Sequence, residues 1–133
     1  MTPRHKGAFA EYKFITKAIS LQLNALLPAM EGQAYDVVID NGRKFFKVQV
    51  KFGVRDKRRK YSHTVLLERR INSRTYTGKE YQASEVDFYA VYIASKDLFY
   101  IIPFYVPTAK SITITNNSNN KFSQYLDNWD QFL

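Results

Sequence analysis

Cysteine is absent from this 133-residue chain, and histidine occurs only at His5 and His63. Without cysteine the protein forms neither disulfides nor thiolate metal sites, and nothing in the composition indicates an oxidising compartment. The two histidines have no partner at ligand spacing, which argues against a zinc site or a histidine-based catalytic centre. The serine and threonine residues also lack the context of a nucleophile elbow.

Long hydrophobic runs are missing too. No segment reaches the roughly 18 uninterrupted apolar residues that a membrane-spanning helix needs. Residues 1–6 are polar and lack the apolar stretch of a signal peptide. We therefore expect a soluble, cytoplasmic protein without a membrane partner.

The chain does contain ample apolar and basic material. Hydrophobic residues make up 45% of it and aromatic residues 16%, which is enough for a packed core, and its length favours one domain. Twenty Lys and Arg against twelve Asp and Glu give a net charge of +8. This excess is typical of proteins that bind nucleic acid or an anionic membrane, although a merely soluble basic protein can share it.

Apolar residues near the N-terminus recur at helical spacing. They predict a helix from Pro3 to about Leu26 or Leu27, with Thr2 as its N-cap. Its apolar stripe contains Ala8, Tyr12, Ile15, Ala18, Ile19, Leu23 and Leu26. Glu11 falls on this stripe, where an ionised carboxylate is costly unless it is paired or binds a metal. The alternative is that Glu11 lies at the edge of the stripe and reaches solvent.

A β-hairpin is the next element that the sequence predicts. Two segments of alternating polarity, 35–40 and 46–52, flank Asn41-Gly42. An Asn-Gly pair between two such segments is the strongest short-range signal of a hairpin turn.

Three chemically active side chains share one face of this hairpin. A two-residue loop would pair Asp36 with Lys47, and a four-residue loop would pair Asp36 with Gln49. Directly paired residues share a face, so either register places Asp36, Gln49 and Lys51 on the same side of the sheet.

The rest of the chain predicts further strands around one central sheet. Short apolar segments bounded by turn residues favour strands at 64–67, 86–93, 98–102 and 111–115. Residues 71–82 read as an irregular loop or ribbon, and the Asn-rich run 116–120 as a turn or linker. The amphipathic tail, 122–132, is expected to dock on the body or on another subunit.

Half of the basic residues lie between Lys51 and Lys79. The residues that we expect to bind phosphate are Lys57, Arg58, Arg59 and Lys60, and Arg55 joins them in the DNA-binding set. Arg and Asn side chains can reach base edges when a β-ribbon enters the major groove. The residues that we assign to base reading are Arg69, Arg70, Asn72 and Arg74. The alternative is an ordinary solvated loop.

Asp36, the run Gln49-Val50-Lys51 and the upstream Glu11 together resemble the active-site pattern of the PD-(D/E)XK nuclease superfamily. The match is closest to its small intron-encoded homing endonucleases and covers most of residues 6–107. The resemblance implies an α/β, restriction-endonuclease-like core with a central mixed β-sheet flanked by an N-terminal helix. The expected organisation is a nuclease core at 1–107, containing a basic DNA-binding segment at 51–82, and a C-terminal extension at 108–133 for docking or oligomerisation.

The same resemblance implies a mechanism. Asp36, Gln49 and Glu11 would hold Mg²⁺ or Mn²⁺, and Lys51 would orient or help to deprotonate the attacking water. Gln49 departs from the usual acid at its position, since an amide oxygen can bind Mg²⁺ but brings no charge.

The implied function is that of a metal-dependent, sequence-specific double-strand DNA endonuclease of the homing type. One core supplies one active site, so a homo-oligomer is expected to cut both strands. A Holliday-junction resolvase-like nuclease and a non-catalytic DNA-binding module are the alternatives.

Overall fold

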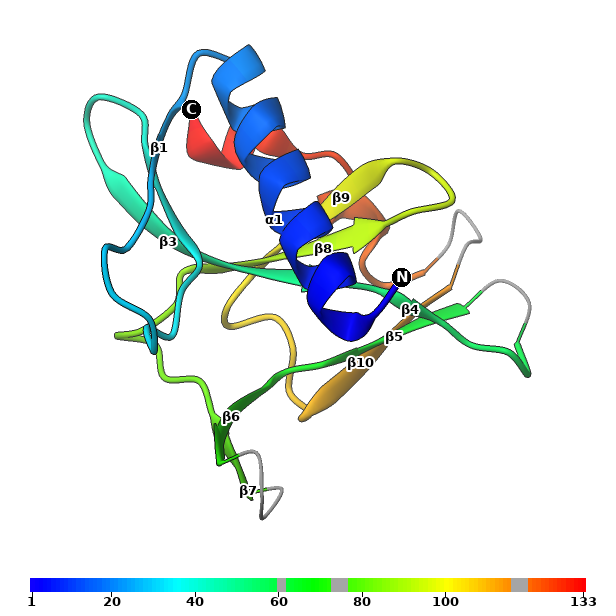
Figure 1. The fold of residues 1–133 in the computed structure, drawn as a ribbon. Helices are drawn as coiled ribbons and strands as arrows, with labels where there is room; N and C mark the ends of the chain where they lie inside the picture. Colours follow the sequence, from blue (N-terminus) through cyan, green and yellow to red (C-terminus); the bar gives the residue numbers. More distant parts are fainter. Residues whose placement is uncertain (60–61, 73–76, 116–119) are drawn as a thin grey trace.

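The computed structural model describes residues 1–59, 62–72, 77–115 and 120–133 (Figure 1). In these ranges the helix α1 spans Pro3–Ser20, and the 3₁₀ segments η1 and η2 span Ser123–Tyr125 and Trp129–Phe132. The strands are β1 (Asn24–Leu26), β2 (Val37–Asp40), β3 (Phe45–Phe52), β4 (Val54–Arg55), β5 (Ser62–Leu66), β6 (Glu68–Asn72), β7 (Thr77–Glu80), β8 (Phe88–Ile93), β9 (Leu98–Pro103) and β10 (Ser111–Thr115). No helix in the described ranges is long and apolar enough to cross a membrane.

Five strands build the main sheet, in the order β1-β2-β3-β8-β9. Its central pair, β3 and β8, is parallel, and the other neighbouring pairs are antiparallel. Helix α1 lies across one face of this sheet and contacts β3 (Figure 1). The predicted α/β fold, with a central mixed sheet flanked by an N-terminal helix, is confirmed.

Two smaller sheets accompany the single central sheet that the sequence predicted. Strands β10, β5 and β4 form a three-stranded antiparallel sheet, and β6 pairs with β7 in a two-stranded ribbon. Figure 1 shows this β6–β7 ribbon extending away from the body. The ribbon starts earlier than the predicted segment 71–82, and residues 73–76 lie outside the described part of the chain.

Helix α1 begins as the sequence predicts. The hydroxyl oxygen of Thr2 accepts a hydrogen bond from the backbone N–H of His5, 3.2 Å away. Pro3 occupies the first helical turn, where its missing N–H costs nothing. The predicted N-cap is confirmed.

The predicted end of this helix, near Leu26, is wrong. Helix α1 ends at Ser20, and Gln22 adopts a positive φ of 63° that turns the chain away from the helix axis. The following residues pair with β2 as the edge strand β1. Pairing with the sheet satisfies their backbone groups, and this tertiary interaction outweighs the helical spacing of the apolar residues.

The buried face of α1 also differs from the predicted stripe. Ala10, Phe14 and Ala18 are fully buried, whereas Tyr12 and Ile19 are 65% and 60% exposed. The stripe is rotated because the large buried side chain is Phe14, which packs against aromatic rings from the far end of the chain.

Those rings belong to the C-terminal tail, which packs on the body of its own chain. Trp129 stacks on Phe14 with ring centroids 4.9 Å apart, and Phe132 meets Phe88 edge to face at 5.0 Å. Figure 1 shows the tail beside α1. The tail therefore completes the first core, the one beneath α1. Residues 116–119 of the Asn-rich run lie outside the described residues.

A second core lies between the other face of the main sheet and the three-stranded sheet. Val91 of β8 belongs to it, together with Val65 of β5 and Ile114 of β10. Gly53 allows the two sheets to join, because its N–H donates to the Tyr92 carbonyl at 2.9 Å and a Cβ atom would lie 3.1 Å from that oxygen. The main sheet is thus covered on both faces.

Candidate active site

The hairpin of β2 and β3 forms the longer of the two predicted loops. Asp40 lies opposite Phe45, which leaves residues 41–44 as a four-residue loop. The side chain of Asp40 accepts a hydrogen bond from the N–H of Gly42, whose φ is 89°. Local side-chain acceptors thus stabilise a wider turn than the two-residue type that Asn-Gly favours.

This register places Asp36 beside Gln49. Val37 lies opposite Val48, and the N–H of Asp36 donates to the Val48 carbonyl at 2.9 Å. The Asp36 carboxylate then accepts a hydrogen bond from the N–H of Val50, also at 2.9 Å. Asp36 therefore binds the β3 backbone on both sides of Gln49.

The Asp36 carboxyl is partly buried, and burial raises its pKa above the ordinary value. The hydrogen bond from Val50 and the positive charge of Lys51 act in the opposite direction, because both stabilise the ionised form. Asp36 is thus electrostatically coupled to Lys51.

Glu11 reaches the same place from α1. Glu11 and Asp36 both line a cavity of about 420 Å³, whose wall is completed by Tyr35 and residues 27–33. Burial raises the pKa of Glu11, and the negative charge of Asp36 raises it further. The cavity therefore holds two like charges, neither of which is fully solvated.

Lys51 lies two residues beyond Gln49 on the same face of β3. Its ammonium group donates a hydrogen bond to the hydroxyl of Tyr81 at 3.2 Å, and it lies 5.2 Å from the centre of that ring. Burial lowers the pKa of Lys51, and the charge of Asp36 partly restores it. The sequence did not single out Tyr81, because no local spacing links two residues 30 positions apart.

The available side chains fit a hard divalent cation. Within the described residues, no group of three or more His, Cys, Asp or Glu side chains is placed to hold a metal ion. The candidate ligand set has only two acidic members, the carboxylates of Glu11 and Asp36. Its third member is the neutral amide oxygen of Gln49. All three side chains offer oxygen ligands, the type that Mg²⁺ prefers. A cation bound here would also neutralise the charge of the two carboxylates.

The basic segment divides into two separate regions. One is an exposed turn after β4, which carries Lys57, Arg58 and Arg59 and is closed by a hydrogen bond from the Arg58 N–H to Asp56 at 2.9 Å. Arg55 is exposed on β4 beside this turn. Lys60 lies outside the described residues.

The other basic region is the β6–β7 ribbon. Its first strand contains Arg69, Arg70 and Asn72, whereas Arg74 lies outside the described part of the chain. The turn precedes β5 and the ribbon follows it, so the two regions lie at opposite ends of a five-residue strand, roughly 17 Å long. The contact between Lys51 and Tyr81, the residue after β7, connects the candidate site to the ribbon.

Comparison with solved structures relates this fold to nucleases. The structure resembles the bacterial homing endonuclease I-Ssp6803I with a TM-score of 0.88 and 24% identity, covering 100% of this chain and 94% of that one. It also resembles Hjc, a Holliday junction resolvase from the archaeal hyperthermophile Archaeoglobus fulgidus, with a TM-score of 0.52 and 16% identity over 83% of this chain and 84% of that one. At these identities the two likenesses show a shared fold.

Comparison with curated proteins gives no match. The sequence matches the PD-(D/E)XK endonuclease family over residues 1–132, a range that includes the C-terminal tail as well as the core. The resemblance that the active-site pattern predicted is confirmed, and this chain belongs to the PD-(D/E)XK endonuclease family.

Proposed function

We propose that this protein is a Mg²⁺-dependent, sequence-specific double-strand DNA endonuclease of the homing type. The environment of Asp36 carries the proposal. Asp36 hydrogen-bonds to the β3 backbone on both sides of Gln49, lines a cavity together with Glu11, and interacts electrostatically with Lys51. Family membership and the likeness to a bacterial homing endonuclease support it.

Glu11, Asp36 and Gln49 are the residues that would hold the metal ion. A bound Mg²⁺ supplies Lewis-acid polarisation of the scissile phosphate and stabilises charge on the leaving oxygen. Lys51 carries a positive charge beside Asp36, and its role is to orient the attacking water or to neutralise charge that develops in the transition state. Hydrolysis adds water to phosphorus and breaks the bond to the 3′ oxygen, which leaves a 5′ phosphate and a 3′ hydroxyl.

The distribution of charge supports duplex DNA as the substrate. A two-stranded ribbon fits the major groove, where Arg and Asn can read base edges, and the ribbon strand β6 contains Arg69, Arg70 and Asn72. The exposed turn with Arg58 and Arg59 adds phosphate contacts. Each chain contributes one candidate site, so a homo-oligomer is the simplest assembly that cuts both strands.

Plasmid cleavage tests the proposed chemistry. The parent protein should nick or linearise a plasmid that carries its target when Mg²⁺ is present, and chelation should stop the reaction. Asp36→Asn and Lys51→Ala should each reduce the rate by at least about a hundredfold. Asp130→Asn and Lys121→Ala, which change exposed side chains of the same types, are the matched controls and should cleave normally. A parent that binds DNA but never nicks it would favour the non-catalytic DNA-binding module.

The phosphate contacts have a separate test. Replacing Arg58 and Arg59 by Ala should weaken binding to all DNA sequences about equally, and should reduce the slope of log affinity against log salt by roughly two. Fluorescence anisotropy at several salt concentrations measures both quantities. An unchanged slope would show that this turn does not contact phosphate.

A second candidate function is a structure-selective nuclease of the resolvase type, favoured by the structural likeness to the archaeal resolvase. The two candidates differ in substrate. Cleavage of four-way junctions without cleavage of linear duplex sites would favour the resolvase, whereas selection of cut sites from a random duplex library would favour the homing type.

A further inference from the structure

Tyr81 occupies the base of the β6–β7 ribbon. It directly follows β7, whose last residue, Glu80, pairs with Glu68 at the start of β6. Unlike the exposed Glu80 before it, Tyr81 is only 7% exposed. The chain thus leaves the ribbon and enters the body at this residue.

The Tyr81 side chain contacts the ammonium group of Lys51 in two ways. The hydroxyl accepts its hydrogen bond at 3.2 Å, and the ring centre lies 5.2 Å from Nζ, within the range of a cation–π interaction. A lysine side chain has four rotatable bonds, and its ammonium group can occupy many positions unless contacts fix it. Two contacts to one rigid aromatic ring therefore restrict where the ammonium group lies.

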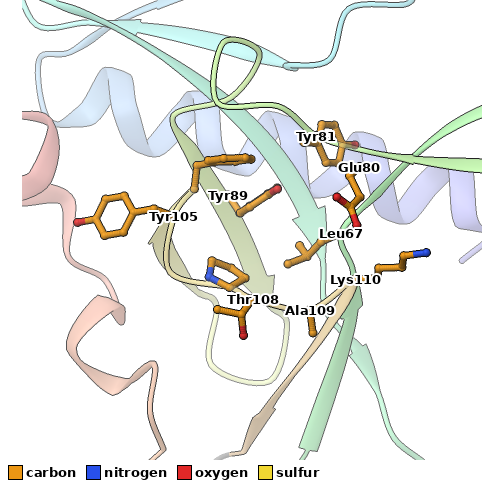
Figure 2. A pocket seen from close by; sticks show the side chains of 10 residues that line it. Leu67, Glu80, Tyr81, Tyr89, Tyr105, Thr108, Ala109 and Lys110 are labelled. Atoms are coloured by element: carbon orange, nitrogen blue, oxygen red, sulfur yellow. The ribbon is translucent and has the colours of Figure 1, made fainter.

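The Tyr81 ring is itself held by the body of the protein. It packs edge to face against Tyr89 of β8, with ring centroids 5.8 Å apart. Figure 2 shows Tyr81, Tyr89, Glu80 and Leu67 around a cavity of about 270 Å³ at the base of the ribbon. Leu67 is the residue before β6, so both ends of the ribbon enter the body at this cavity.

We propose that Tyr81 is the positioning residue for Lys51, and that it couples the placement of this lysine to the base of the β6–β7 ribbon. The proposal rests on the proposed nuclease function for its catalytic consequence. Tyr81 acts through Lys51 and does not itself touch the reacting atoms. DNA bound along the ribbon would therefore contact the segment that leads directly into Tyr81, the residue that holds the lysine.

Tyr81→Phe is the decisive variant, because it keeps the ring and its packing but removes the hydroxyl that accepts from Lys51. We expect kcat to fall by about tenfold or more, the usual effect of losing a hydrogen bond to a charged group, while KM and DNA affinity stay unchanged. Tyr81→Leu, which also removes the ring, should lower kcat further. Tyr105→Phe changes an 80% exposed tyrosine that lines the same cavity, and should behave as the parent does.

A second measurement needs no cleavage. In the protein without DNA or metal, acetylation by N-hydroxysuccinimide acetate is followed by mass spectrometry, with the exposed Lys121 as the internal reference. Acetylation of Lys51 relative to Lys121 should rise several-fold in Tyr81→Phe and not in Tyr105→Phe, because the amine is released.

The two measurements separate failure of this proposal from failure of the proposed function. Unchanged acetylation of Lys51 in folded Tyr81→Phe would overturn the positioning role whether or not the parent cleaves DNA. Increased acetylation with a parent that never cleaves would support the positioning role and reject the nuclease function. Equal losses of kcat and DNA affinity without a change in acetylation would also overturn it, since they indicate a general structural defect.

Discussion

Tyr92 and Trp129 in the first core differ from His63, on the opposite side of the main sheet, in the hydrogen bonding of their polar atoms. In the first core, the polar atoms of buried aromatic rings reach carboxylates: Tyr92 donates to Asp97 at 2.6 Å, and the Trp129 indole N–H donates to Asp127 at 3.0 Å. On the side of the second core, the buried Nδ1 atom of His63 has no hydrogen-bond partner among the described residues. A buried polar atom without a partner is costly, so His63 carries an energetic cost that Tyr92 and Trp129 avoid.

The two faces of strand β3 differ in polarity. Val48 and Val50 face the first core, whereas Gln49 and Lys51 point to the opposite side and are only partly buried. Apolar residues on the first face contribute stability by burial. Gln49 and Lys51, on the second face, are the residues of β3 that the proposed chemistry needs, so within this strand the buried apolar side chains and the candidate site residues lie on opposite faces.

The largest expected effect comes from opening the first core. Phe14→Ala removes a fully buried ring that contacts Trp129, Phe99 and Phe132, and should lower the free energy of unfolding by about 3–5 kcal/mol. Urea unfolding measures this loss. Phe45→Ala, at a ring that is 65% exposed, is the matched control and should cost less than about 1 kcal/mol. Equal losses of unfolding free energy in the two variants would show that burial of Phe14 in the first core does not account for the effect.

A smaller effect is expected on the polar face of β3. Gln49→Glu adds a third carboxylate to the proposed metal site, opposite Asp36 in the strand register, so the metal-free protein should lose about 1–2 kcal/mol through like-charge repulsion. Mg²⁺ should raise the melting temperature of this variant more than that of the parent, because the added charge strengthens cation binding. Gln82→Glu is an exposed control. Equal Mg²⁺ shifts in the parent and Gln49→Glu would place Gln49 outside the metal site.

The raised pKa of Glu11 predicts a pH-dependent difference in stability. Its carboxyl holds a proton to higher pH in the folded state than in the unfolded chain, where the ordinary pKa is 4.5, so the metal-free fold loses stability as pH rises above 4.5. Glu11→Gln should therefore be more stable than the parent at neutral pH and lose this advantage below pH 4.5. Chemical unfolding at several pH values measures the difference. Asp130→Asn, at an exposed carboxyl outside this cavity, is the control for the substitution itself.

The smallest effect is expected from His63, and its sign is opposite. Burial, together with the charges of Arg55 and Lys96, lowers its pKa below 6.5, so the unfolded chain binds the proton first as pH falls. Stability is therefore lost as pH decreases from 6.5 toward the folded pKa. His63→Gln should remove this part of the pH dependence, whereas the exposed control His5→Gln should keep it. Identical pH profiles in both variants would contradict a buried, neutral His63.

Features that depend on neighbouring residues were predicted well from the sequence. Alternation of apolar and polar residues identified β2 and β3, and short apolar segments bounded by turn residues identified β5, β8, β9 and β10. Thr2 with Pro3 marked the start of α1. The spacing of Asp36, Gln49 and Lys51 pointed to the family that the comparison confirms. Their grouping on one face follows from the two-residue period of a strand, which is a property of the chain itself.

Other features required the folded chain. The end of α1 was wrong because Asn24–Leu26 pairs with β2, and the rotation of its buried face follows from the tail packing on Phe14. The contact between Lys51 and Tyr81 joins residues 30 positions apart. Local sequence patterns reflect the conformational preference of each residue beside its neighbours. These three features instead arise from surfaces that meet only after the chain has folded, so they leave no regular spacing in the sequence.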